Sequence, residues 1–226
     1  MRQHLLIDAD DTLWENNIYF ERAFEEFCAF LDHSTLTPPE IRAVLDEIEL
    51  ANIRTNGYGA ANFGRNMSQC YLELAERPAR DDDMGHIAGI ARRINHHPLE
   101  IIGGVPETLD YLSRRHDLIL LTKGDRHEQS AKIEKSGLAA FFRRALIVHE
   151  KNPDAYRGVI LEQELTGEAS WMIGNSPKSD INPALEAGIG AVYVPHARTW
   201  HLEHEEIRGG GRLLVVERFE DLTKFF

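Results

Sequence analysis

The chain has 226 residues, of which 42% are hydrophobic and 27% are charged, and its formal net charge at pH 7 is −12. This composition excludes a disordered or fibrous protein and predicts one large domain or two modest lobes. Because 37 acidic residues outnumber 25 lysines and arginines, the chain repels polyanions, and we expect no nucleic acid among its partners. No apolar run approaches the ~20 residues of a membrane span, and the amino terminus turns acidic by Asp8, which predicts a cytoplasmic protein with no membrane partner.

Short apolar runs recur along the chain, and each is typical of a buried parallel strand. They are His4–Ile7, Leu118–Leu121, Ala145–Val148, Trp171–Ile173 and Ala191–Val194. Buried parallel strands lack apolar and polar alternation because helices cover both faces of their sheet. Helices that stop at a glycine are predicted between these strands, over Asp125–Lys135 and Asp180–Ala187. The pattern favours an α/β fold with a doubly wound parallel sheet.

The interval from about residue 18 to residue 97 interrupts this alternation with a helical block. A capping-box pattern, Thr37-Pro38-Pro39-Glu40, opens the second of its predicted helices. Apolar positions at helical spacing mark all of them, namely Phe20, Phe24, Phe27 and Leu31, then Ile41, Val44, Leu45 and Ile48, then Met67, Tyr71 and Leu74, and finally Ile87, Ile90 and Ile94. We expect residues 1–14 and 101–226 to form the α/β core and residues 15–100 to form a smaller all-helical lobe.

Acidic residues follow the first predicted strand directly, in the segment Asp8-Ala9-Asp10-Asp11-Thr12-Leu13. The carboxyl ends of parallel strands open into the crevice where α/β proteins bind ligands. Two carboxylates at Asp8 and Asp10 can both reach one reacting centre there, but close like charges are costly unless a cation is bound or one carboxyl is protonated. The alternative is that Asp11 and Thr12 cap a helix and that the other acids are solvated.

Three later strands also end in polar residues. Thr122 closes one strand, Lys151 follows the next within a few residues, and Gly174-Asn175-Ser176-Pro177-Lys178-Ser179-Asp180 follows a third. Taken singly, a threonine can cap a helix, a lysine can be a solvated charge, and Asp180 can cap its own helix. Their joint order after successive strands favours a shared site.

In this order the chain resembles the haloacid dehalogenase-like hydrolase superfamily, whose motifs are DxDx(T/V), a strand ending in Thr or Ser, a Lys, and an acidic motif of the GDxxxxD type. Asp8 and Asp10 match the first motif, Thr122 the second, Lys151 the third, and residues 174–180 the fourth. The resemblance spans essentially the whole chain. It implies a Rossmann-like core with a helical cap of type C1, as in the phosphoglycolate phosphatase-like branch.

The resemblance also implies roles for these residues. Asp8 would be the nucleophile that forms an aspartyl-phosphate, and Asp10 would be the general acid and base. Thr122 and Lys151 would bind the phosphoryl oxygens. Mg²⁺ would be held by the Asp8 carboxylate, the Asp10 backbone carbonyl and the fourth motif. Asn175 stands where the first acid of that motif is usual, so we expect a neutral ligand at Asn175 and a direct or water-mediated one at Asp180, the division between them staying open.

Further substrate-binding positions are expected at Lys123, next to Thr122, and at Trp14 and Asn16, just after the nucleophile segment. Lys123 has a surface-cation alternative, and the segment that holds Trp14 and Asn16 has a simple connector as its alternative. Two histidine pairs suggest zinc, but adjacent imidazoles point apart and a third ligand is missing, so we do not expect it. The pairs are His96–His97 and His201 with His204.

Dehalogenases of the superfamily lack an aspartate two positions after the nucleophile, so Asp10 favours phosphate esters. The expectation is a Mg²⁺-dependent phosphatase, a monomer or homodimer, acting on a small phosphorylated metabolite through an aspartyl-phosphate. Two alternatives stay open: a mutase-like phosphotransferase, and a phosphate- or metal-binding protein in which Asn175 marks weakened catalysis.

Overall fold

The computed structural model describes residues 2–226, and the chain divides into two compact units. One unit holds the residues up to Asn17 together with Leu99–Phe226, and the other holds Ile18–Pro98. The sequence pattern predicts these boundaries slightly elsewhere, after residues 14 and 100. Within residues 2–226, none of the helices combines the length and the apolar character that crossing a membrane requires.

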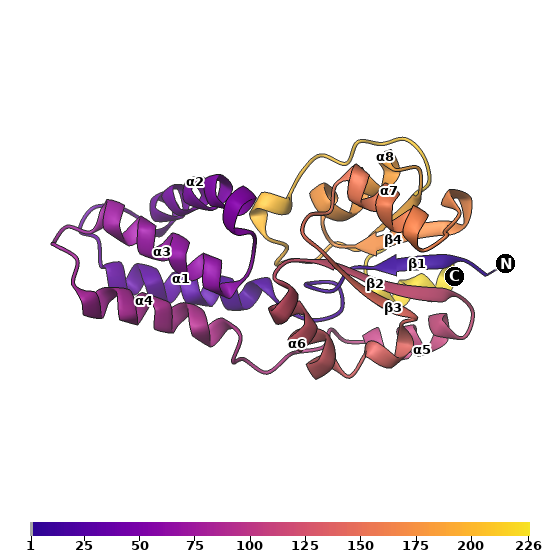
Figure 1. Cartoon of the computed structure of the whole chain (residues 1–226), viewed down its shortest axis with the longest axis horizontal. Helices are drawn as coiled ribbons and strands as arrows, with labels where there is room; N and C mark the ends of the chain where they lie inside the picture. The colour runs from indigo at the N-terminus through magenta and orange to yellow at the C-terminus, as the bar shows by residue number, and fades with distance from the viewer. Residues whose placement is uncertain (1) are drawn as a thin grey trace. The chain divides into compact units, whose positions relative to one another are not determined.

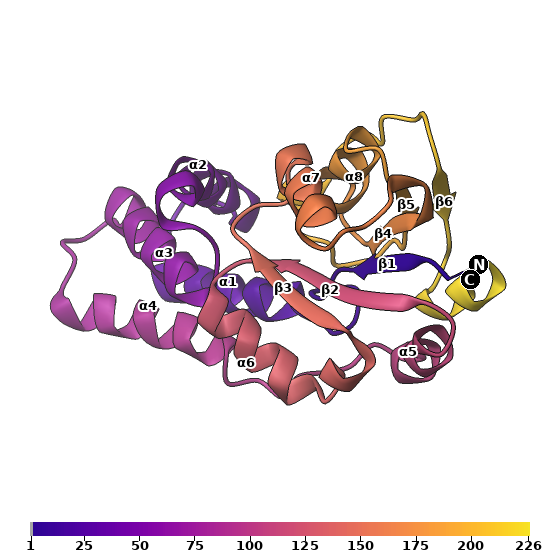
Figure 2. The same cartoon turned by 45° about the vertical axis from the view of Figure 1, so that its right-hand side comes forward.

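A six-stranded parallel sheet, in the order β3-β2-β1-β4-β5-β6, forms the centre of the first unit (Figures 1 and 2). The strands are β1 (His4–Ile7), β2 (Asp117–Lys123), β3 (Arg144–Val148), β4 (Ser170–Gly174), β5 (Gly190–Tyr193) and β6 (Leu213–Val215). This order runs outward from β1 in both directions, as in Rossmann-like folds. The predicted doubly wound α/β fold is therefore confirmed.

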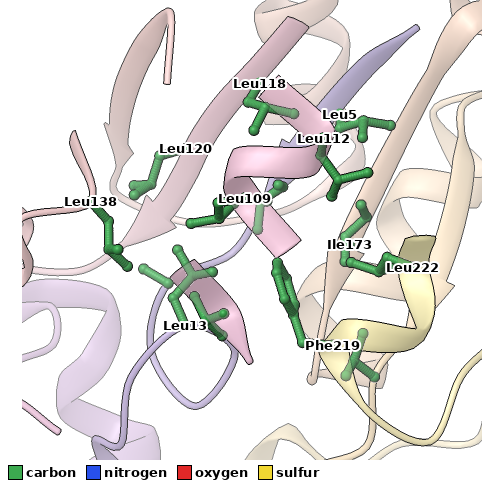
Figure 3. Close-up of a cluster of buried hydrophobic side chains, with 14 of the residues drawn as sticks. Leu5, Leu13, Leu109, Leu112, Leu118, Leu120, Leu138, Ile173, Phe219 and Leu222 are labelled. Atoms are coloured by element: carbon green, nitrogen blue, oxygen red, sulfur yellow. The ribbon is translucent and has the colours of Figure 1, made fainter. Parts of the chain in front are cut away.

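Successive residues of each central strand alternate between two hydrophobic layers. Leu5 and Ile7 of β1 pack in one layer with Leu109 of α5 (Val105–Ser113) and with Phe219, while Leu6 packs in the other layer with Tyr156 of α7 (Pro153–Glu162). Figure 3 displays part of the first layer, which also includes Ile133 of α6 (Arg126–Ser136). The second layer includes Ala184 of α8 (Asn182–Glu186). Because both faces are covered, the strands carry the near-continuous apolar runs seen in the sequence.

The edges of the sheet differ from the sequence expectations. The strand expected at Ala145–Val148 is present as β3 but is not fully buried, since it pairs with β2 alone and leaves Ala145 exposed. At the other edge, β6 was not predicted, because three partly covered residues make no buried apolar run. The helix expected over Asp180–Ala187 is in fact a π-helical turn, Pro177–Ile181, followed by the short helix α8.

The second unit contains the expected helices α1 (Asn17–Leu31), α2 (Pro38–Asn56), α3 (Ala60–Leu74) and α4 (Asp81–Ile94). At the start of α2, the Thr37 N–H donates to Glu40 Oε2 over 2.8 Å, the reciprocal contact of a capping box. Helices α3 and α4 approach closely at Gly64, where an added Cβ would lie 2.7 Å from the Ala91 Cβ. The apolar stripes read from the sequence meet in the core of this unit.

Glu49 lies in this core, with 7% of its surface exposed. Burial raises the pKa of Glu49 from 4.5 to about 7, with Arg42 opposing the shift and Asp46 adding to it. The folded chain therefore keeps a proton between pH 4.5 and about 7 that the unfolded chain releases, so stability falls as the pH rises through this window. Glu49→Gln removes this loss and is expected to stabilise the protein at pH 8 by up to about 3 kcal/mol.

The measurement is denaturant unfolding followed by far-ultraviolet circular dichroism at pH 4.5 and pH 8. Glu47→Gln, an exposed position on the same helix, is the matched control and should leave stability unchanged at both pH values. An equal effect of Glu49→Gln at pH 4.5 and pH 8 would contradict the prediction.

Candidate functional site

The strand register brings the polar strand ends to one edge of the sheet. Ile7, the last residue of β1, pairs with Leu120 of β2 on one side and with Ile173 of β4 on the other. The Asp8 N–H donates to the Ile173 carbonyl over 2.9 Å, so the acidic segment that begins at Asp8 leaves the sheet beside Gly174. Thr122 is the next-to-last residue of β2 at this same edge, and it is buried.

Lys151 connects two acids, Asp8 and Asp180. Its ammonium donates to Asp8 Oδ1 over 2.5 Å and to Asp180 Oδ1 over 2.8 Å, and the Lys151 and Asp180 side chains are both 1% exposed. Burial alone would lower the pKa of Lys151, but the carboxylates of Asp180 and Asp8 hold it above its ordinary value. A permanent cation therefore lies between the carboxylates that follow β1 and β4.

The second carboxylate oxygen of Asp8 and the amide oxygen of Asn175 share one neighbour, Thr12. The Thr12 hydroxyl lies 3.1 Å from Asp8 Oδ2 and 3.2 Å from Asn175 Oδ1, so it contacts both acceptors. The Asn175 amide nitrogen donates to Thr199 Oγ1 over 2.8 Å, which leaves the amide oxygen as the atom near the Thr12 hydroxyl. The Asp8 carboxylate and the Asn175 amide oxygen are thus both within hydrogen-bond reach of the same hydroxyl.

These residues fit a hard divalent cation. Burial, followed by the negative charge of Asp180, raises the pKa of Asp8 to about 7, although Lys151 acts in the opposite direction. The buried carboxylates of Asp8 and Asp180 therefore still repel each other, and a bound divalent cation would offset this repulsion. The Asp8 and Asp180 carboxylates and the Asn175 amide oxygen are the oxygen ligands that Mg²⁺ prefers.

Gly174 makes room for the Asp180 carboxylate. A Cβ at position 174 would lie 2.2 Å from Asp180 Oδ2, which accepts the Ser176 N–H over 3.0 Å. Gly174→Ala must therefore displace Asp180, and we expect it to cost about 1–3 kcal/mol of stability and to weaken Mg²⁺ binding. Titration with Mg²⁺ by isothermal calorimetry and thermal unfolding measure both effects.

The matched control is Gly158→Ala in α7, where an added Cβ meets nothing within 4 Å. Because alanine favours a helix more than glycine does, this variant is expected to be slightly more stable than wild type. Unchanged stability and Mg²⁺ affinity in Gly174→Ala would show that Asp180 is not confined as described.

Asp10 is held by a different set of donors. Its carboxylate accepts the indole N–H of Trp14 over 2.7 Å, the side-chain amide of Gln129 over 2.8 Å, and the ammonium of Lys132 over 2.7 and 2.8 Å. Burial would raise the pKa of Asp10, but Lys132 together with these hydrogen bonds lowers it below its ordinary value. Asp10 is therefore a carboxylate at neutral pH.

The expected substrate-binding residues have defined partners. Trp14 is fully buried, and Asn16 Oδ1 accepts a hydrogen bond from Lys132 over 2.9 Å. The Lys123 ammonium contacts Glu203 Oε1 and Ser179 Oγ, each over 2.8 Å. The structure thus brings Asp8, Asn175, Asp180 and Lys151 together, while Lys123 is engaged by Ser179 and Glu203.

The capping alternative for Asp11 and Thr12 applies to Asp11 alone. Asp11 has a φ of 58°, and its carboxylate accepts the N–H groups of Asn16 and Asn17 at the start of α1. Thr12 instead faces Asp8. Among residues 2–226, one group of three acids and histidines is compact enough for a metal, namely Asp11, Glu15 and His196. There His196 turns Nε2 toward Glu15 and Nδ1 toward Asp11, so the imidazole links the two carboxylates.

Sequence reasoning missed Gln129, Lys132 and Glu203. Gln129 and Lys132 lie three residues apart on the helix that follows Thr122, so their shared helical face was a signal that could have been read. Glu203 lies on a one-turn helix far along the chain and offered no comparable pattern.

Comparisons with known proteins identify the family of the chain. The sequence profile of the haloacid dehalogenase-like hydrolase family matches residues 5–194. A haloacid dehalogenase-like family hydrolase from Xanthomonas campestris is 33% identical, with a TM-score of 0.87 over 99% of this chain and 90% of that chain.

Two more distant structures share the fold. An L-2-haloacid dehalogenase from Xanthobacter autotrophicus is 17% identical, with a TM-score of 0.67 over 100% of this chain and 98% of that chain. A predicted phosphoglycolate phosphatase from Haemophilus somnus is 14% identical, with a TM-score of 0.68 over 99% and 97% of the two chains. No curated protein sequence matches the chain. The profile match and the Xanthomonas structure show that the chain belongs to the haloacid dehalogenase-like hydrolase family.

Proposed function

We propose that the protein is a Mg²⁺-dependent phosphoric monoester hydrolase that acts on a small phosphorylated metabolite through an aspartyl-phosphate. One observation carries the proposal: the buried Lys151 ammonium lies between the carboxylates of Asp8 and Asp180, with a second aspartate two residues after Asp8. This arrangement supports the proposal, because phosphoryl transfer requires a nucleophile, a cation and oxygen ligands close to one another, and Asp8, Lys151 and Asp180 are candidates for these roles.

Asp8 forms the covalent bond. A carboxylate oxygen of Asp8 attacks phosphorus, and the bond between phosphorus and the ester oxygen breaks, leaving the phosphoryl group on Asp8. Water then attacks the same phosphorus, and the Asp8 carboxylate departs as inorganic phosphate forms. One difficult displacement is thereby divided into two easier ones.

Asp10 moves the protons of both steps. In the first step it gives a proton to the departing alkoxide oxygen, and in the second it takes a proton from the attacking water. Because Lys132 lowers the pKa of Asp10, the residue starts as a base and must acquire its proton before the first step. In the second step Asp10 acts as a base, and this role requires the ionised form that it already has at neutral pH.

The remaining groups stabilise charge. The Lys151 ammonium and the Thr122 hydroxyl are donors for the phosphoryl oxygens as negative charge redistributes over them. The Asp8 and Asp180 carboxylates and the Asn175 amide oxygen are the residues that would hold Mg²⁺. When bound, the ion neutralises phosphoryl charge and offsets the repulsion between the two acids.

Asp10 supports a phosphatase over a dehalogenase. Dehalogenation of a 2-haloacid releases a halide, which needs no proton, so a carboxyl at this position would have nothing to protonate. A phosphate monoester releases an alkoxide, and a positioned acid lowers that barrier. The resemblance drawn from the sequence points the same way, since dehalogenases of the superfamily lack this aspartate.

The test is turnover of p-nitrophenyl phosphate with Mg²⁺ and with EDTA, alongside chloride release from 2-chloropropionate. We expect Mg²⁺-dependent release of nitrophenol and phosphate, abolished by EDTA, and no chloride.

Chloride release without phosphatase turnover would overturn the proposal in favour of a dehalogenase. Nitrophenol release without matching inorganic phosphate would indicate transfer to a second hydroxyl. The absence of any turnover above Asp8→Asn would indicate a binding protein. A panel of phosphorylated sugars, nucleotides and small acids then identifies the metabolite.

A further inference from the structure

Helix α6 turns two polar side chains toward Asp10. Lys132 Nζ lies 2.8 Å from Asp10 Oδ1 and 2.7 Å from Oδ2, and Gln129 Nε2 lies 2.8 Å from Oδ2. Residues three apart share one face of a helix, so both donors come from the same side of α6. The family motifs matched in the sequence include neither residue.

The contact is built into the fold around it. Gln129 is 5% exposed and packs against Gly124, where a Cβ would lie 3.1 Å from Gln129 Nε2. Its amide also donates to the Lys123 carbonyl over 3.2 Å. Asp125 caps the helix by accepting the Glu128 N–H over 2.9 Å. Helix α6, which carries both donors, is thus joined through Gln129 to the end of β2.

The Lys132 ammonium donates three hydrogen bonds. It donates to both Asp10 oxygens and to Asn16 Oδ1 over 2.9 Å, and an ammonium has three N–H bonds to give. A charge-assisted contact to both carboxylate oxygens holds the carboxyl more firmly than a neutral donor can. Lys132 therefore constrains where Asp10 points.

We infer that Lys132 is a positioning residue that, with Gln129, holds the Asp10 carboxylate in the orientation in which it exchanges protons with the leaving oxygen and with water. This inference rests on the proposed function. Proton transfer requires the donor and acceptor within hydrogen-bond reach, and a misplacement of about 1 Å can cost on the order of 100-fold in rate. Trp14 also contacts Asp10, but it is fully buried and its removal would empty the core. Lys132 is the cleaner position to change because its side chain is 18% exposed.

The experiment separates the two chemical steps with p-nitrophenyl phosphate. Nitrophenolate leaves without a proton, so the first step does not need Asp10, whereas attack by water in the second step does. Lys132→Met is expected to show a burst of nitrophenol at a rate within about threefold of wild type, followed by steady-state turnover reduced by about 10- to 100-fold. Asp10→Asn should give the same pattern, and the double variant should be no slower than Asp10→Asn.

Two further variants distinguish positioning from a general structural effect. Lys132→Arg keeps a charged donor for the carboxylate and should restore steady-state turnover to within about threefold of wild type. Lys135→Met, an exposed lysine on the same helix, should behave as wild type.

Unchanged steady-state turnover in Lys132→Met overturns the inference. So does a burst that falls in parallel with the steady state and is not restored by arginine, because that result indicates a damaged pocket. A wild-type chain without Mg²⁺-dependent turnover overturns the proposed function itself, and is distinguished from both by its failure before any substitution.

Discussion

Asp8→Asn is expected to reduce turnover of p-nitrophenyl phosphate by about 10⁴-fold or more, because removal of a nucleophile leaves only binding and charge stabilisation. The same substitution should not destabilise the fold. Burial and Asp180 raise the pKa of Asp8 from 3.8 to about 7, so the folded chain loses stability as the pH rises through this range. A neutral amide avoids that loss, and the variant should unfold at the same temperature as wild type or higher at pH 8 in EDTA.

Activity and thermal unfolding on the same preparations check this pair of effects. Asp154→Asn is the matched control, since Asp154 is an aspartate with a 91% exposed side chain that pairs with Arg157 at the surface. It should change neither quantity. A variant of Asp8 that retains more than a few per cent of wild-type turnover would mean that another group forms the covalent bond, and a clear drop in unfolding temperature would mean that the Asp8–Lys151 contact outweighs the repulsion.

Lys151→Met is expected to lose about 10²–10³-fold in turnover and about 3–5 kcal/mol in stability at pH 8 in EDTA. The substitution leaves the buried carboxylates of Asp8 and Asp180 without their shared cation. Methionine has nearly the same length as lysine, so the loss of charge is tested with little change in packing. Denaturant unfolding and steady-state kinetics give the two values.

A double variant tests the electrostatic cause. Asp8→Asn combined with Lys151→Met removes one of the two unpaired charges, so it should be more stable than Lys151→Met alone by at least about 1 kcal/mol. If the double variant is as unstable as the single one, the destabilisation comes from packing around Lys151 rather than from the uncompensated acids. Lys135→Met serves as the surface control in both measurements.

Local pattern was sufficient for most of the fold. The strands β1, β2, β4 and β5 are buried on both faces, and such strands are recognisable in the sequence as apolar runs bounded by polar residues. The helices α1 to α4 carry apolar stripes that were read directly as periodicity. The edge strand β6 escaped because half-covered, three-residue strands carry too little hydrophobic signal.

The residues that follow the strands were visible in the sequence for a related reason. Parallel strands end at a common edge, so polar residues at those ends could be assigned to one place before any contact was known. Asp8, Asn175 and Asp180 were identified in this way, and strand register brings them within reach of the side chains of Thr12 and Lys151. Spacing alone did not decide how metal binding is divided between Asn175 and Asp180.

Only the tertiary structure decided which charges meet. Three lysines pair with acids that are far away in the sequence. Lys151 pairs with Asp8 across 143 residues, Lys132 with Asp10 across 122 residues, and Lys123 with Glu203 across 80 residues. A lysine side chain is long and flexible, and its partner is set by which backbone segments the packed sheet brings within its reach. Local sequence specifies a strand or a helix because neighbours along the chain dictate it, whereas an ion pair depends on the three-dimensional positions of segments that have no local influence on one another.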